Sequence, residues 1–169
     1  MSLFDPQGLL ETRHVDEIDT SYHLCPEGTY PAQIADVRAR EGQSEKVAVT
    51  WANLDVVWDI TDANVKAVMN MDRVQVTQQM FLDLVQDGNG GIALPVRIDW
   101  GTNRNMPLKR IMEATGAKKT NFSLNELKFQ TAAVKVEHEA DRQGATNADG
   151  TPVKYARVTR VAPLSSLSR

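Results

Sequence analysis

Most of this chain alternates apolar and polar residues with a period of two, which is the pattern of a β-strand with one buried face. The alternation extends over five segments, residues 30–40, 46–60, 74–85, 129–138 and 153–161. Turn-forming residues separate several of them, most clearly in Asp87–Gly91. A phase change near Asn53 predicts a bulge or bend, and Gly28 is expected to take a positive φ in a turn before the first strand. The chain is therefore expected to fold mainly into strands.

One segment, Met106–Gly116, carries a full set of helix signals. Pro107 suits the first helical turn, and Gly116 suits the left-handed residue that ends a helix. Asn105 stands where a side chain can cap the first turn. The predicted apolar face consists of Leu108, Ile111 and Met112. Two shorter helical elements are expected, one begun by Thr61 or Asp62 and one within residues 122–127.

Strands with a single good helix before the last pair fit a small barrel better than a sandwich. We therefore predict a mainly β fold with one helix (α+β class), forming an OB-like, partly closed barrel of about five strands. The predicted domain covers residues 22–163, with an extended arm over residues 1–21 and a short tail over residues 164–169.

The charges are unevenly placed, although the net charge is only -3. Residues 1–28 hold six acids and one base, whereas residues 97–135 hold eight bases and three acids. Residues 151–169 add four bases and no acid. Local charge decides whether a polyanion can dock, so the basic C-terminal third is a candidate surface for one. A solvated surface, or a contact between subunits, accounts for the same pattern equally well.

The sequence contains no motif for catalysis. The patterns of serine hydrolases, zinc proteases and nucleotide-binding loops are absent, and a hairpin turn accounts for the glycines of Gly88–Gly91. The single cysteine, Cys25, is expected to be a packed thiol. His138, Glu139 and Asp141 form a weak candidate for a cation site, and a solvated loop end is the favoured interpretation. We expect no enzyme activity, no metal and no cofactor.

Nucleic-acid binding has more support, because single strands are held by cations together with aromatic side chains on which bases stack. The candidate phosphate contacts are Arg97, Arg104, Lys109, Arg110, Lys118, Lys119, Lys154, Arg157 and Arg160. Trp100 and Tyr155 are the candidate stacking residues, although a place in the core suits Trp100 about equally well. Trp51 and Trp58 are favoured as core residues.

Leu24–Ile34 resembles the opening "Pro-Glu-Gly-x-Tyr" strand of a family of unknown function that occurs in tailed phages and prophages. The similarity continues in the same order through Lys46–Trp51, Gln79–Leu84, Pro107–Gly116, Ala133–Val136 and Tyr155–Val158. The resemblance implies an OB-type barrel that binds single-stranded DNA. It supplies no set of binding residues, so the candidates above rest on charge and aromatic content.

The expected function is that of a phage-encoded, non-catalytic protein that coats single-stranded DNA during replication or recombination, in the cytoplasm of the host bacterium. The expected partner is single-stranded nucleic acid, and a homo-oligomer is compatible with the charge pattern. No membrane association is expected, because no apolar run approaches the ~20 residues of a membrane span. The alternative is a virion structural protein, such as a capsid cement or decoration protein. Its unequal charges and residues 1–21 would then contact a capsid protein.

Overall fold

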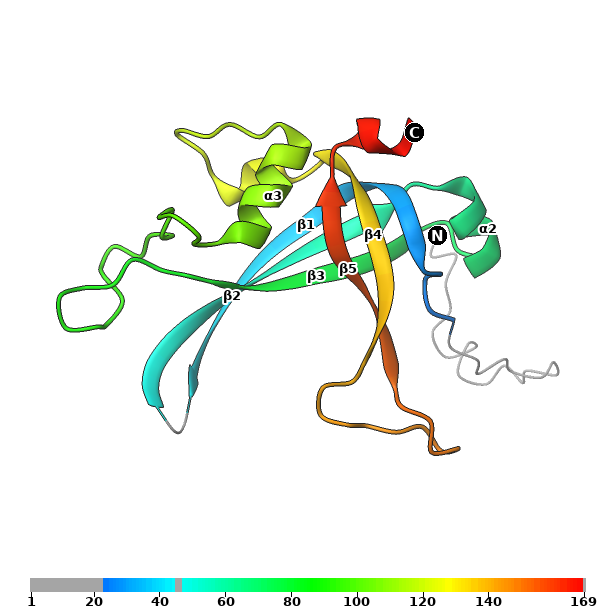
Figure 1. The fold of residues 1–169 in the computed structure, drawn as a ribbon, viewed down its shortest axis with the longest axis horizontal. Helices are drawn as coiled ribbons and strands as arrows, with labels where there is room; N and C mark the ends of the chain where they lie inside the picture. Colours follow the sequence, from blue (N-terminus) through cyan, green and yellow to red (C-terminus); the bar gives the residue numbers. More distant parts are fainter. Residues whose placement is uncertain (1–22, 45–46, 169) are drawn as a thin grey trace, which may run out of the picture.

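The computed structural model describes residues 23–44 and 47–168, with side chains except at residues 41–51 and 168. Its main element is an antiparallel sheet (Figure 1). The strands are β1 (Gly28–Ser44), β2 (Val47–Ile60), β3 (Val74–Leu82), β4 (Thr131–Ala140) and β5 (Lys154–Ala162). They lie in the order β3-β2-β1-β4-β5, so β4 returns beside β1 as in a Greek key. The predicted mainly β class and its five strands are confirmed.

Two α-helices occur in the described residues, namely the one well-formed helix of the predicted fold and the shorter element that was expected to begin at Thr61 or Asp62. The first, α2 (Ala63–Met69), joins β2 to β3 and is capped by the carboxylate of Asp62, which accepts the N–H groups of Asn64 and Val65. The second, α3 (Met106–Thr115), has the predicted bounds, and Gly116 ends it with a φ of 68°. The 3-10 helices are η1 (Leu124–Leu127) and η2 (Leu164–Ser168). No helix of the described residues is long and apolar enough to cross a membrane.

Asn105 does not cap α3, which corrects the sequence prediction. Its side chain is buried and turned away from the helix, accepting the N–H of Asp83 at 2.9 Å. The same amide donates to the carbonyl oxygens of Asp83 and Asp99, at 2.9 and 2.8 Å. Asn105 therefore ties the segment after β3 and the segment before Trp100 to the start of α3.

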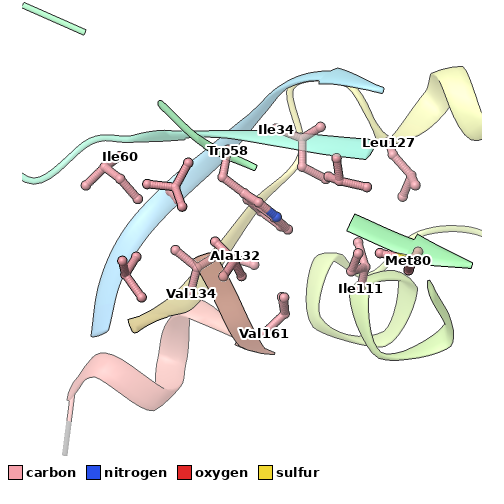
Figure 2. Close-up of a cluster of buried hydrophobic side chains, with 14 of the residues drawn as sticks. Ile34, Trp58, Ile60, Met80, Ile111, Leu127, Ala132, Val134 and Val161 are labelled. Carbon is pink, nitrogen blue, oxygen red and sulfur yellow. The ribbon is translucent and has the colours of Figure 1, made fainter. Parts of the chain in front are cut away.

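The core lies between the curved sheet and α3, and the indole of Trp58 is central to it (Figure 2). Trp58 is fully buried, as predicted, and its Nε1 donates to Gln78 at 3.2 Å. Trp51 lies outside the residues whose side chains are described. The pairing has no register shift at Asn53, where we expected a bulge or bend, whereas β1 has one in which Ala35 is the extra residue between the Ile34–Trp58 and Asp36–Val57 pairs.

The Pro-Glu-Gly-x-Tyr motif is a packing device. Gly28 does not have the positive φ that we predicted. It makes room for Tyr30 instead, since a Cβ at Gly28 would lie 2.5 Å from the tyrosine oxygen. The Tyr30 hydroxyl lies 3.1 Å from the carbonyl oxygens of Pro26 and Glu27, to which it can donate. The preceding Cys25 is buried, as predicted, and burial raises the pKa of its thiol.

The sheet is not closed into a barrel, because β3 and β5 occupy its two edges and form no ladder with each other in the described residues. The OB-like barrel therefore stays a prediction. The N-terminal arm predicted for residues 1–21 falls outside the described residues.

Candidate nucleic-acid interface

The two edge strands, β3 and β5, border one hollow of about 460 Å³, which we call the edge groove. Each strand lines it with three alternate residues and with one residue of the opposite phase, which is Met80 on β3 and Val158 on β5. The lining residues are Thr77, Gln79, Met80 and Phe81 from β3, Tyr155, Arg157, Val158 and Thr159 from β5, Asn53 from β2, and the segment 139–143 at the end of β4. The groove thus joins two strands that are distant in the sheet order.

Aromatic side chains stand exposed on both walls of the edge groove. Phe81 on β3 is 70% exposed, and Tyr155 on β5 is 40% exposed. The guanidinium carbon of Arg157 lies 5.4 Å from the centre of the Tyr155 ring, which is a cation–π contact. Flat exposed rings of this kind are surfaces on which nucleobases stack.

The charges that line the edge groove cancel. Arg142 and Arg157 are balanced by Glu139 and Asp141 among the lining residues. The remaining polar lining consists mostly of amides and hydroxyls, which bond to neutral groups as readily as to charged ones. This groove therefore suits bases or other uncharged polar groups better than phosphates.

A second hollow, of about 640 Å³, lies between α3 and the segment that follows it; we call it the tryptophan hollow. It is lined by Trp100, Lys109, Met112, Glu113, Lys119, Asn121 and Phe122. Trp100 is 45% exposed, which excludes the alternative that its indole fills the core. The Lys109 ammonium donates to the carbonyl oxygens of Trp100 and Gly101, at 3.3 and 2.7 Å. These bonds hold the backbone at Trp100 and Gly101 against α3.

A third hollow, of about 560 Å³, lies between α3 and the end of β5; we call it the bridge hollow. Its cations are Arg110 from α3 and Arg160 from β5. It shares Thr159 with the edge groove and Glu113 with the tryptophan hollow. The three hollows are therefore neighbours in series, linked by these shared residues.

The predicted site residues are divided by this arrangement. The three hollows bring together seven of them, namely Trp100, Lys109, Arg110, Lys119, Tyr155, Arg157 and Arg160. The other four, Arg97, Arg104, Lys118 and Lys154, line none of the three.

Two of the predicted phosphate contacts are already committed within the protein. Arg104 is paired with Asp83 and Asp99, at 3.4 and 3.7 Å, and Lys109 is bonded to backbone carbonyls. Both side chains hold the connection between β3 and α3 in place. The side chains of Arg110, Lys119 and Arg160 have no hydrogen-bond or ion-pair partner among the described residues, so they are better suited to a ligand.

Sequence reasoning missed Phe81 and Arg142. Phe81 is one of the most exposed large apolar residues described. The signal was its phase: Val74, Val76 and Met80 are buried on one face of β3, and Phe81 falls on the opposite face. Arg142 has no such signal, because it follows β4 in a polar loop.

No family model matches this chain, and no curated protein matches it in sequence. The function therefore has to be inferred from the hollows themselves.

Proposed function

We propose that the protein binds single-stranded nucleic acid without sequence preference, as a non-catalytic accessory protein of phage DNA replication or recombination. The observation that carries the proposal is the edge groove, in which Phe81 and Tyr155 present exposed rings from opposite walls. Stacking on such rings tolerates every base, because each base has a flat face.

The topology supports an OB-like assignment as part of this proposal. An OB fold is a partly open, five-stranded Greek-key barrel that binds oligonucleotides on its second and third strands and on the loop between the last two. The edge groove of this chain is lined by β2 and β3, by the start of the loop that follows β4, and by β5. The two edge strands of the sheet, β3 and β5, border the same groove, which supports the OB-like assignment.

The distribution of charge fits a strand with its bases inward and its phosphates outward. The edge groove is neutral, whereas Arg110 and Arg160 lie in the adjoining bridge hollow. Phosphate contacts position a strand and carry no sequence information. We therefore expect the bases to occupy the groove and the phosphates to meet the neighbouring cations.

The test is fluorescence anisotropy of a labelled oligo-dT of about 16 nucleotides, the upper site size for one OB fold. Tyr155→Ala and Phe81→Ala should each weaken binding about 5- to 150-fold, through lost stacking. Phe129→Ala is the matched control, because Phe129 is 71% exposed and lines none of the three hollows. Its affinity should equal that of the wild type.

Two outcomes would count against the proposal. No binding by the wild type at low salt would overturn it and favour the virion structural protein. Binding that ignores both groove variants would retain the nucleic-acid ligand and reject the edge groove as its site.

A further inference from the structure

The backbone around the exposed Trp100 is fixed by side-chain hydrogen bonds on both sides of the residue. Asn105 bonds to the carbonyl of Asp99 on one side of it, and Lys109 bonds to the carbonyls of Trp100 and Gly101 on the other. The indole nevertheless remains 45% exposed at the mouth of a hollow that also contains Phe122. A fixed backbone with an exposed ring is a preorganised surface, on which little ordering entropy is lost when a ligand stacks.

Shared lining residues link the edge groove to Trp100 by a route whose cations have no partner among the described residues. It leaves the groove at Thr159 and passes Arg110 and Arg160 in the bridge hollow. It then passes Glu113 and reaches Lys119 in the tryptophan hollow. Aromatic rings therefore stand at both ends of the route, with cations between them.

We propose that a bound single strand leaves the edge groove, crosses α3 through the bridge hollow, and stacks a further base on Trp100. The tryptophan hollow is then a second nucleotide-binding station, occupied only by strands long enough to span the distance from the first. This inference rests on the proposed function.

A flexible chain with negative charges and flat bases fits this route better than a folded partner. The three hollows share only single lining residues, Thr159 and Glu113, and so form a series rather than one broad face. Single-stranded ligands are bound in this way by a groove that tracks the backbone and by rings that receive successive bases. Glu113 is the acid that lines both the bridge and tryptophan hollows, and it should repel the strand that passes it.

The first test measures how the effect of Trp100 depends on the length of the ligand. Binding of oligo-dT of about 4 to 16 nucleotides is measured by anisotropy for the wild type, Trp100→Ala, Tyr155→Ala and the control Phe129→Ala. Trp100→Ala should leave the shortest ligands unaffected and weaken the longest about 5-fold or more. Tyr155→Ala should weaken all lengths, and Phe129→Ala none.

The length series separates the two proposals. If no oligonucleotide binds at all, the proposed function fails and this inference fails with it. If oligonucleotides bind but Trp100→Ala changes no length, the second station is rejected while the function stands. An equal loss at every length would also reject it, since Trp100 would then belong to the first site.

The second test removes the repulsion on the route. Glu113→Gln should strengthen the binding of long oligonucleotides about two- to fivefold, the usual effect of one exposed charge, and should leave the shortest unchanged. Asp72→Asn removes one negative charge from an exposed residue that lines none of the three hollows, so it controls for net charge. Equal effects of both substitutions, or none from Glu113→Gln, would contradict a path across α3.

Discussion

The centre of the sheet and its two edges use the same alternating pattern for different purposes. On β2, the fully buried Trp58 is enclosed by neighbouring strands on both sides. On the edge strands, Phe81 and Tyr155 are exposed in the edge groove, where β3 and β5 do not pair with each other. The aromatic side chain in the centre therefore forms part of the core, whereas the two at the edges lie outside it. The comparison indicates that the groove can lose its aromatic side chains without loss of the fold.

Paired aromatic truncations give the largest effect and test the comparison directly. Trp58→Ala should lower the free energy of unfolding by about 3–5 kcal/mol, because it leaves a cavity in the core. Tyr155→Ala should change it by less than about 0.5 kcal/mol, as exposed substitutions usually do. Urea denaturation measures both. A comparable loss for Tyr155→Ala would show that the edge groove is part of the core.

Asn105→Ala should have the next largest effect, because three buried hydrogen bonds disappear together. The expected loss is about 2–4 kcal/mol of unfolding free energy. Asn103→Ala is a matched control, since Asn103 also has a positive φ (62°, against 50° for Asn105) but is exposed. Equal losses in the two variants would show that the effect comes from backbone strain. They would contradict a stabilising role for the hydrogen bonds of the Asn105 side chain.

Gly116→Ala tests the end of α3, the helix whose Glu113 lines both the bridge hollow and the tryptophan hollow. Because Gly116 has a φ of 68°, an added Cβ should cost about 1 kcal/mol of unfolding free energy. Gly88→Ala is the control, because Gly88 has no positive φ and open space around it, and it should be neutral. A thermal melt that shows no difference between the two would contradict the left-handed end of the helix.

The smallest effect concerns acid sensitivity at the bulge of β1. Asp36 is paired with Arg38 and Lys128, at 2.7 and 3.0 Å, and these hydrogen bonds hold its pKa well below the ordinary value of 3.8. Because the pKa of Asp36 is lower in the folded state, its ionised carboxylate stabilises that state above pH 3.8. This stabilisation is lost as the pH falls toward the folded-state pKa. Unfolding curves of the wild type and Asp36→Asn should therefore converge as the pH is lowered. Parallel curves would show that Asp36 contributes no pH dependence.

Local signals explain which parts of the fold the sequence could predict. The bounds of α3 follow from Pro107 and Gly116, which act within the helix itself. The roles of Gly28 and Asn105 could not be predicted, because they depend on neighbours placed by the fold. Tyr30 turns back over Gly28, and Asp83 lies 22 residues before Asn105 in the sequence.

The candidate site was predictable only in part for the same reason. Aromatic residues among cations pointed to Tyr155 and Arg157, which lie together in the edge groove. Arg104 looked equally suitable, but its carboxylate partner Asp83 follows β3, 21 residues earlier in the sequence. A count of basic residues cannot distinguish a cation that holds a loop from one that is available to a ligand.

The most direct test of the central claim is the salt dependence of oligo-dT binding by the unmodified protein. Two or three phosphates neutralised by Arg110, Lys119 and Arg160, the cations of the hollows without a partner among the described residues, should give a linear plot of log association constant against log salt. The expected slope is about -1.4 to -2.1, since each neutralised phosphate contributes about -0.7. Tight binding at low salt with such a slope is the result that the account predicts. No binding at low salt, or binding that does not respond to salt, would contradict it.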